Sequence, residues 1–329
     1  MRLLFRDVKQ VACLDFPQSS NVGDNAIWLG QHAVLRYLRK QVAYQCDNRS
    51  YSKNQLKRQI GDGTILIAGG GNFGDLWPQS QRFREQVIQD FPENRIIQMP
   101  QSIYFRNREN LERAKKCING HQNFVLLVRD QKSYAFAKNE FTVETHLCPD
   151  LAFGIELQNG FSNLGEKIIL LSREDVEGKA IDSTDVGNNG SQIEKIDWSM
   201  IDRITPFIRV NQILSHSIHN YPKAFSFASS VSSLFYDGVS ERRFRRACDV
   251  LRTARVVITN RLHGHILCLL LGIPHICIDN TLYGKIQNFY DTWTKDSPIT
   301  FWANSADEAV RMAHEIVRDE MLEKVGGMV

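Results

Sequence analysis

The sequence lacks the features that would direct the protein into or across a membrane. Its first residues, MRLLFRDVKQVACLDF, interrupt every apolar stretch with a charge, and no run of about 18 apolar residues occurs in the chain. The seven cysteines are odd in number, scattered and without a CxxC pair, which is typical of reduced core thiols. We therefore expect a cytoplasmic protein that is soluble, or at most peripheral at the inner face of the cell membrane.

A strong charge imbalance is also lacking. Of the 329 residues, 43% are hydrophobic and 23% are charged, and the formal net charge is +3. This composition is that of a globular protein, and the chain is longer than the roughly 250 residues at which single cores stop growing. Because proteins that track nucleic-acid phosphates usually have a stronger basic balance, we expect no nucleic-acid partner and a small anionic ligand instead.

Short apolar runs alternate with helical patterns along the chain, which predicts parallel sheets covered by helices. The segment 154–166 is rich in Gly and Asn and is interpreted as a crossover, and the polar stretch 176–197 as a long loop. The fold class is therefore α/β with two Rossmann-like lobes, 1–155 and 156–329, and a cleft between them. The expected helices are 26–40, 79–91, 108–118, 203–217, 264–271 and 306–323; the expected strands lie within 11–16, 64–71, 95–100, 123–130, 143–150, 166–175, 254–264 and 274–280.

Two segments that follow early strands could contact a ligand. Asn21 and Asp24, in NVGDNAIW, lie where the first helix begins, so Asp24 either caps that helix or handles a substrate hydroxyl. Gly70, Gly71 and Asn72, in IAGGGNFGDLW, lie where the backbone can approach a ligand closely. No helix clearly opens after this glycine run and no Gly-Lys-Ser/Thr follows, so we expect neither a dinucleotide fingerprint nor a P-loop.

Arg129 ends the apolar run NFVLLVRD and therefore lies at the carboxyl end of a strand. A guanidinium in that position can bind a carboxylate or a phosphate through two parallel hydrogen bonds. The alternative is an ion pair with a neighbouring element of the fold. The sequence leaves both interpretations open.

The stretch TNRLHGHILCLLLGIPH combines a strand end, a turn and an uncharged helix. Because residues 264–271 carry no charge, we expect a buried helix whose free N-terminal N–H groups form an anion site. Arg261 and His263 flank this site, and a buried guanidinium is costly without an anion, which predicts a bound phosphate. His263 and His265 are not expected to bind a metal, since positions i and i+2 do not share a helix face. The histidines interpreted as structural are His216, His219, His265 and His275.

Arginines gather in the segment SERRFRRACDVLRTAR. Most runs of this kind are solvated helix faces. The clustering nevertheless motivates the hypothesis that this face contacts anionic lipid headgroups or a lipid-phosphate acceptor. The residues concerned are Arg242, Arg243, Arg245, Arg246, Arg252 and Arg255.

Taken together, these segments resemble the polysaccharide pyruvyl transferase family. The most specific part is RLHGHI followed by a short helix and Gly-x-Pro. The resemblance implies a GT-B-like fold and transfer of a pyruvyl group from phosphoenolpyruvate to two hydroxyls of a sugar as a cyclic ketal, with release of phosphate. The acceptor would belong to a bacterial exopolysaccharide, capsule or cell-wall polymer precursor. The matching segments are NVGDNAIW, AGGGNFGDLW, QMPQSIYF, VRDQKSY, CPDLAF, TNRLHGHI and YGKIQNFY.

The resemblance also implies roles for individual residues. The second lobe would bind phosphoenolpyruvate, with His263 as general acid, and the first lobe would bind the saccharide, which is free or lipid-linked. No metal and no organic cofactor is expected, and Asn260 departs from the acidic residue common in the family. The expected donor contacts are Arg129, Arg261, Leu262, His263 and Lys285; the expected acceptor contacts are Asn21, Gly70, Gly71 and Asn72; and the hydroxyl-side base is Asp24 or Asp75.

Two other functions remain open from the sequence. One is a nucleotide-sugar-dependent glycosyltransferase of the same architecture, which would need a site for a base and a ribose. The other is a non-catalytic binding partner in a polysaccharide assembly complex. Protection by phosphoenolpyruvate but not by nucleotide sugars in a thermal shift assay would separate the first from a pyruvyl transferase.

Overall fold

The computed structural model describes residues 1–157, 165–173, 193–201, 235–279 and 283–326, together with 209, 210, 213 and 217. Most of the helix expected at 203–217, and with it His216 and His219, lies outside these residues. The same holds for most of the expected crossover and of the expected polar loop.

The chain divides into two compact units. The first comprises Met1–Ile155 and Arg203–Arg242, and the second comprises Glu156–Asp202 and Arg243–Val329. The chain thus changes unit three times, after Ile155, Asp202 and Arg242, whereas the expected lobe boundaries include only the first change. Helix α9 (Tyr236–Leu251) begins in the first unit and ends in the second.

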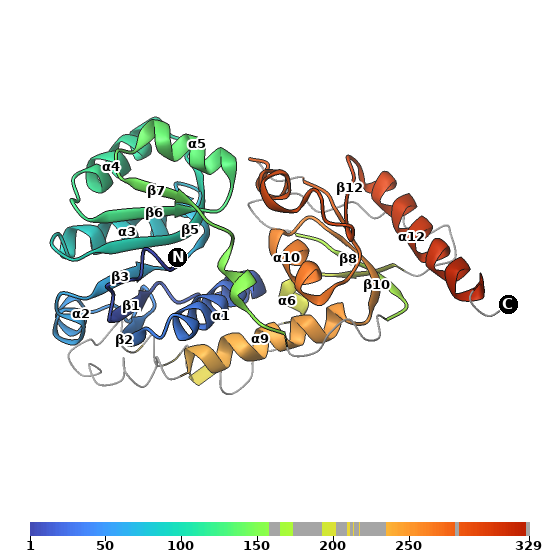
Figure 1. Ribbon diagram of the computed structural model, residues 1–329, viewed down its shortest axis with the longest axis horizontal. Helices are drawn as coiled ribbons and strands as arrows, with labels where there is room; N and C mark the ends of the chain where they lie inside the picture. Colours follow the sequence, from blue (N-terminus) through green and yellow to red (C-terminus); the bar gives the residue numbers. More distant parts are fainter. Residues whose placement is uncertain are drawn as a thin grey trace. The chain divides into compact units, whose positions relative to one another are not determined.

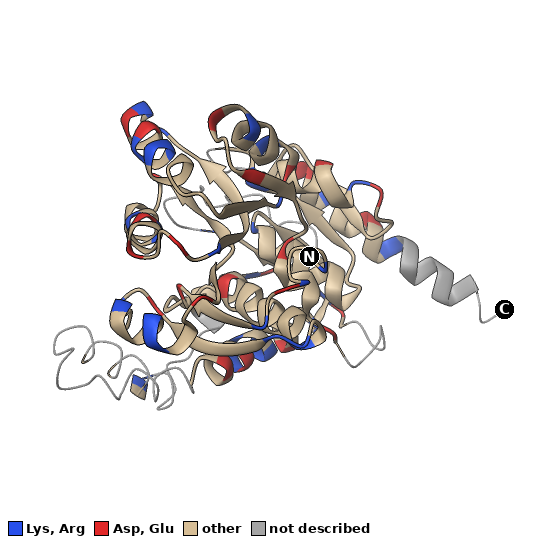
Figure 2. Cartoon of the chain, turned by 60° about the vertical axis from the view of Figure 1, so that its left-hand side comes forward, with Lys and Arg blue, Asp and Glu red and all other residues tan. Residues whose placement is uncertain are grey.

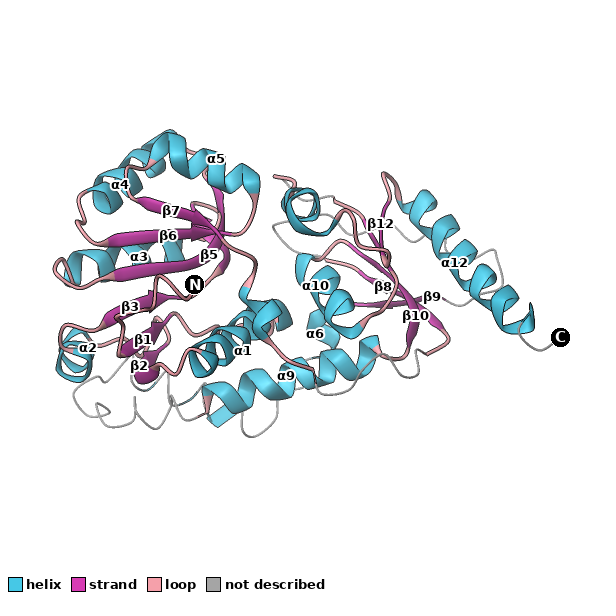
Figure 3. Cartoon of the chain, in the orientation of Figure 1, coloured by secondary structure: helices cyan, strands magenta, loops and turns pink. Residues whose placement is uncertain are grey.

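A parallel sheet forms the centre of the first unit (Figure 1). Its order is β2-β1-β3-β5-β6-β7, with β4 paired to β5, and every pair of neighbours is parallel. Helices connect successive strands except β3 and β4, and they cover the sheet (Figure 3). The strands are β1 (Gln10–Leu14), β2 (Gln41–Cys46), β3 (Thr64–Ile67), β4 (Gly70–Gly74), β5 (Ile96–Tyr104), β6 (Phe124–Val128) and β7 (Glu144–Leu147); the helices are α1 (Val22–Tyr37), α2 (Lys53–Ile60), α3 (Pro78–Asp90), α4 (Arg108–Asn119), α5 (Gln131–Glu140) and the 3₁₀ helix η1 (Leu151–Gly154).

Both faces of this sheet are buried. Ala12 and Leu14 of β1 pack into one hydrophobic cluster, and Val11 and Cys13 pack into another. Successive strand residues point to opposite faces, so a strand covered on both sides must be apolar at every position. This is why β1 reads as an unbroken apolar run in the sequence.

The second unit repeats this plan with five parallel strands in the order β12-β11-β10-β8-β9. The strand β9 lies at the end of the stretch 176–197 that was expected to be a loop, and that expectation is wrong for residues 193–196. Its burial pattern explains the error, because only Ile196 is buried in this edge strand while Glu194 and Lys195 are exposed. The strands are β8 (Lys167–Leu171), β9 (Ile193–Ile196), β10 (Ala254–Thr259), β11 (His275–Cys277) and β12 (Thr300–Trp302); the other helices are α6 (Trp198–Ile201), α10 (Leu262–Leu271), α11 (Lys285–Phe289), the π-helix η2 (Tyr290–Thr294) and α12 (Ala306–Gly326).

The glycine run also differs from the expectation. It forms the strand β4, and after three residues α3 begins at Pro78, one residue before the start of the helix expected at 79–91. Proline fits the first position of a helix because its missing N–H has no partner there in any case. Gly74 lets β4 approach β5 closely. Its φ is +127°, and a Cβ there would lie 1.7 Å from the carbonyl oxygen of Tyr104.

Both sheets reverse their strand order at one place. In the first unit β1 lies between β2 and β3, and in the second β8 lies between β9 and β10. Open α/β sheets bind ligands at the carboxyl ends of the two strands where the order reverses. The structure confirms the α/β class with two Rossmann-like units. The cleft stays a prediction.

The cysteines and the lengths of the helices bear on two expectations from the sequence. All seven cysteines are free and five of them are buried, as expected of core thiols. Among the described helices, none is both long and apolar enough to cross a bilayer.

Replacing Gly30 by alanine should destabilise the protein by roughly 2 kcal/mol, the cost of an overpacked contact. A Cβ at Gly30 would lie 1.8 Å from the carbonyl oxygen of Leu151, so η1 would have to move away from α1. In an exposed helix the same substitution stabilises by up to about 1 kcal/mol. Urea unfolding followed by circular dichroism decides the sign, and exposed Gln59→Ala in α2 serves as a near-neutral control. A variant as stable as the wild type would contradict the close contact.

Candidate active site

The carboxyl edge of the first sheet brings together residues that follow β1 and β3. Asn21 caps α1 by accepting a hydrogen bond from the Gly23 N–H at 3.0 Å, and its Nδ2 donates to Asp24 Oδ2 at 2.8 Å. Gly70 has a φ of +135°, and a Cβ built there would lie 4.0 Å from Asp24 Oδ1. Gly71 follows in β4. Asn21, Asp24 and Gly70 therefore lie at one place, as the sequence predicted for an acceptor site.

Asn72 joins this edge to a buried polar network. Its Oδ1 accepts hydrogen bonds from Arg84 at 2.9 Å and from Gln101 at 2.8 Å. Its Nδ2 in turn donates to Asp15 Oδ2 at 3.4 Å. The Asn72 side chain is thus fixed by several partners and presents its amide to a carboxylate.

Arg84 is the charged centre of that network. It is fully buried, donates to Gln98 and Gln81 at 2.6 Å each, and lies 4.5 Å from the centre of the Phe73 ring. Burial lowers the pKa of its guanidinium to about 10, partly offset by Asp15 and Glu85, so it stays charged at neutral pH. Arg84 is absent from the residues expected from the sequence. The signal that could have found it is a buried strand, QMPQS, with two glutamines in an apolar context.

Asp15 also was not expected to be functional. It directly follows β1, its side chain is partly exposed, and its backbone is left-handed with a φ of +68°. Burial raises the pKa of its carboxyl group to about 6, and the charges of Asp47 and Asp24 add to this, against the opposing effects of Arg84 and Asn72. Among the described residues its carboxylate therefore has no direct ion pair, only a long contact from Asn72.

Asp75 does not join this group. Its two oxygens accept the backbone N–H groups of Arg106 and Asn107 at 2.8 and 2.7 Å. Partial burial would raise the pKa of Asp75, but these hydrogen bonds outweigh it and the pKa is lowered. A carboxylate held in this way stabilises the start of α4 and is a weak base. The sequence named Asp75 as one of two candidate bases, and that role stays a prediction.

Arg129 lies at the end of β6 as expected but is fully buried. It forms an ion pair with Asp150 and donates from Nε to Ser102 Oγ at 3.0 Å. Asp150 also accepts the Ala152 N–H, so the pair connects the sheet to η1. The alternative interpretation from the sequence, an ion pair with a neighbouring element, describes this arrangement, and a direct donor contact stays a prediction.

In the second unit, Arg261, Leu262 and His263 lie between β10 and α10. Arg261 is the residue that caps α10, and its backbone N–H donates to Thr259 Oγ1 at 3.0 Å. Leu262 and His263 form the first turn of the helix and are 4% and 6% exposed. A Cβ at Gly264 would lie 2.5 Å from Thr259 Oγ1, so the helix begins tightly against the strand end.

The guanidinium of Arg261 forms an ion pair with Asp197. The sequence predicted that an anion must accompany a buried cation here and assigned that role to a bound phosphate. The structure supplies a carboxylate of the chain itself, just after β9, in the stretch expected to be a loop. Any phosphate at Arg261 must therefore share the guanidinium with Asp197.

Two further residues complete this edge. Asn260, which departs from the acidic residue of the resembled family, accepts the Arg173 N–H at 2.6 Å and so connects the ends of β8 and β10. Lys285 is 7% exposed and opens α11, whose N–H groups at Ile286 and Gln287 are capped by Asp279. The approach of Lys285 to a donor phosphate stays a prediction.

Comparison with known proteins identifies the family of this chain. The sequence profile described as "Polysaccharide pyruvyl transferase" matches residues 21–281, from the start of α1 to beyond β11. The chain belongs to the polysaccharide pyruvyl transferase family. It is thus a member of a transferase family, and the resemblance inferred from the short segments is confirmed.

Individual relatives span most of the chain. Pyruvyl transferase 1 of Schizosaccharomyces pombe is 32% identical over 94% of this chain and 77% of its own length. The putative pyruvyl transferase EpsO of Bacillus subtilis is 30% identical over 88% of this chain and 87% of its own. A solved structure of an uncharacterised protein from Klebsiella pneumoniae matches with a TM-score of 0.56 at 20% identity, over 92% of this chain and 96% of that one, and shows the same fold.

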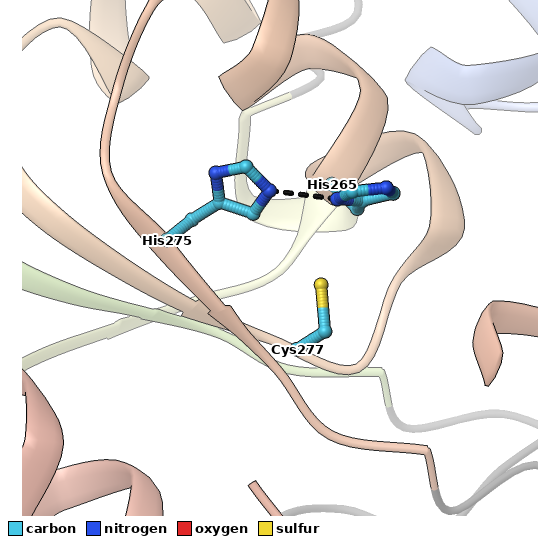
Figure 4. Close-up of side chains that lie close together, drawn as sticks. All are labelled: His265, His275 and Cys277. Atoms are coloured by element: carbon cyan, nitrogen blue, oxygen red, sulfur yellow. Dashed lines mark hydrogen bonds between the residues drawn. The ribbon is translucent and has the colours of Figure 1, made fainter. Parts of the chain in front are cut away.

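Two buried histidines, His265 of α10 and His275 of β11, are joined by a hydrogen bond (Figure 4). The Nδ1–H of His275 donates to the carbonyl of Ile273 at 2.8 Å, so its Nε2 accepts from His265 Nδ1 at 2.6 Å. The Nε2 of His265 then accepts the Thr294 hydroxyl proton at 2.9 Å. This confirms the structural interpretation of both histidines.

His265, His275 and Cys277 are the one group within the described part of the chain that could hold a metal ion. Their geometry is that of a hydrogen-bond chain, because two imidazole ligands of one tetrahedral zinc would have their nitrogens about 3.3 Å apart. The observed separation of 2.6 Å holds a proton between them. Burial also raises the pKa of the Cys277 thiol, which keeps it protonated.

The arginine segment does not form one basic face. Arg243 is 3% exposed, whereas Arg242, Arg245 and Arg252 are exposed. Figure 2 shows acidic and basic residues close together along the described helices. The contact with anionic lipid headgroups stays a prediction.

Acid should destabilise the protein through His265 and His275. Burial lowers the pKa of His275 to about 4, and burial with the nearby His275 lowers the pKa of His265 well below its usual value. Near pH 6.5 the two histidines bind protons in the unfolded chain but not in the folded chain. Their contribution to the free energy of unfolding is therefore present above that pH and is lost as the pH falls. His275 alone should account for about 2 kcal/mol at pH 5.

The measurement is the free energy of unfolding at pH 7.5 and at pH 5. His275→Gln should lower stability at pH 7.5 but flatten the difference between the two conditions. The exposed His146→Gln serves as the control and should change neither value. Equal acid sensitivity in His275→Gln and wild type would show that the hydrogen-bonded histidines do not cause the loss of stability in acid.

Proposed function

We propose that the protein transfers a pyruvyl group from phosphoenolpyruvate to two hydroxyls of one saccharide residue, forming a cyclic ketal and releasing phosphate. Membership of the polysaccharide pyruvyl transferase family supports the class of reaction. The observation that carries the proposal is the first turn of α10, where His263 follows Arg261 at the carboxyl end of β10, beside the reversal of strand order.

The donor chemistry explains why an acid and cations are needed together. Phosphoenolpyruvate is an enol ester, so protonation of its methylene carbon creates a cation at the central carbon. An imidazole can deliver that proton near neutral pH, and His263 takes this role. Arg261 and the free N–H groups of α10 bind the phosphate and stabilise it as it departs.

The acceptor chemistry requires groups that bind hydroxyls. The edge formed by Asn21, Asp24, Gly70, Gly71 and Asn72 offers carboxylate and amide groups together with glycine backbone. Saccharide hydroxyls both donate and accept hydrogen bonds, so this mixture suits them. The saccharide is a unit of a polysaccharide or of its precursor, free or carried on a lipid.

His263→Ala should reduce turnover by about 100-fold or more while leaving the fold intact, because it removes the acid that protonates the methylene carbon. The assay follows phosphate release from phosphoenolpyruvate and the gain of pyruvate minus water by the saccharide in mass spectrometry. The exposed His146→Ala is the matched control and should keep full turnover. Unchanged turnover in His263→Ala would remove this histidine from the mechanism.

Phosphoenolpyruvate should raise the melting temperature of the wild type, whereas UDP and GDP sugars should not. Arg261→Lys should need a roughly tenfold higher phosphoenolpyruvate concentration for the same rise in melting temperature. The lysine ammonium is a point charge and cannot replace the two parallel hydrogen bonds of a planar guanidinium. The lysine can still pair with Asp197, so the fold should persist. Protection by nucleotide sugars alone would favour the glycosyltransferase, and undiminished phosphoenolpyruvate protection in Arg261→Lys would contradict the phosphate contact.

A further inference from the structure

Asp15 occupies the position in the first unit where an open α/β sheet binds its ligand. It directly follows β1, and β1 and β3 are the neighbouring parallel strands at which the strand order reverses. The residues after β3 include Gly70 and Asn72 of the acceptor edge. Asp15 therefore lies with the proposed saccharide contacts.

The backbone of Asp15 is held in a conformation that most residues avoid. Of the described residues other than glycine, only Asp15 and Arg39 have a positive φ. Arg39 follows the end of α1, where left-handed residues are ordinary. Asp15 instead ends a strand, and backbone strain of this kind clusters at functional sites.

The carboxylate of Asp15 has fewer hydrogen bonds than those of Asp24 and Asp75, the two acids that the sequence proposed as the base. In the described part of the chain its side chain accepts one bond, from Asn72 at 3.4 Å. Asp24 Oδ2 accepts from Asn21 and Ser19, and both oxygens of Asp75 accept backbone N–H groups. A base needs a lone pair that is not already used, and Asp15 Oδ1, on a residue that is partly exposed, accepts no hydrogen bond from a described side chain.

We infer that Asp15 is the base that accepts the proton of the attacking saccharide hydroxyl, with Asn72 and Arg84 as positioning residues behind it. The inference rests on the proposed pyruvyl transfer. Asn72 fixes one carboxylate oxygen, and Arg84 fixes Asn72. The second oxygen of Asp15 receives the proton.

Both additions of saccharide hydroxyls take place at the central carbon of phosphoenolpyruvate. The saccharide oxygen bonds to the central carbon of phosphoenolpyruvate, the double-bond electron pair takes a proton from His263 at the methylene carbon, and the hydroxyl proton passes to Asp15. The bond to the phosphate oxygen then breaks with its electron pair. The second hydroxyl bonds to the same carbon and its proton ends on the phosphate, while Asp15 releases its proton to solvent and His263 takes one up from solvent.

The electrostatics of Asp15 fit this task. Its pKa is raised to about 6, first by burial, so the group is ionised at neutral pH but is a stronger base than an ordinary aspartate. The same shift means that the folded protein binds a proton more tightly than the unfolded chain. Asp15 therefore lowers stability as the pH rises from about 4 to about 6 and keeps it lowered above that.

Asp15→Asn tests the inference because it keeps the shape, and asparagine tolerates the left-handed backbone. With phosphoenolpyruvate and a panel of p-nitrophenyl hexosides and N-acetylhexosaminides, its turnover should fall by about 100-fold or more. The limb of kcat/KM that rises with a midpoint near pH 6 should disappear. Protection by phosphoenolpyruvate should remain, and exposed Asp62→Asn should behave as the wild type.

A second readout separates a catalytic from a structural role. Asp15→Asn should melt roughly 2–6 °C above the wild type at pH 7.5, and this gap should close by pH 4. Loss of turnover together with a lower melting temperature at pH 7.5 would assign a structural role and overturn the inference. So would turnover within threefold of the wild type, or a rising pH limb that disappears in Asp24→Asn and persists in Asp15→Asn.

The failure of the proposed function has a different signature. Wild-type protein that gains no protection from phosphoenolpyruvate and pyruvylates none of the glycosides would contradict pyruvyl transfer itself, and the role of Asp15 with it. An active wild type with an equally active Asp15→Asn would contradict the assignment of Asp15 alone.

Discussion

The reversal of strand order within two fully parallel sheets is the constraint on which the rest of the structure depends. It leaves the carboxyl ends of β1 and β3 in one unit, and of β8 and β10 in the other, at the places where such sheets bind ligands. The short connections after these strands then determine which side chains are presented. In the first unit they present Asp15, Asp24 and Asn72, and in the second Arg261 and His263.

Three buried arginines differ in what balances their charge. Arg129 and Arg261 each form an ion pair with a carboxylate of the chain, Asp150 and Asp197. Arg84 donates to amide oxygens, which are dipoles and not full charges. Its positive charge is therefore left to act on Asp15, which makes this arginine part of the electrostatics at the carboxyl edge of the first sheet.

The fold could be predicted largely from the sequence because buried parallel strands must be apolar on both faces, and such runs are visible. The elements that were missed or misassigned lack that signal. β9 is an edge strand with only Ile196 buried, and β4 is made mostly of glycine. For the site, the residues at visible strand ends were predicted, whereas Arg84 lies in the middle of a helix and its role depends on strands far away in sequence.

By itself, the sequence determined the α/β class, the family and the position of the Arg-Leu-His turn, because each depends on local patterns and on residues close together in the chain. Only the tertiary structure decided which partners neutralise the arginines, and that Asp15 has a raised pKa and a strained backbone. These properties depend on burial and on charges brought together from separate strands. No local pattern of residues encodes them.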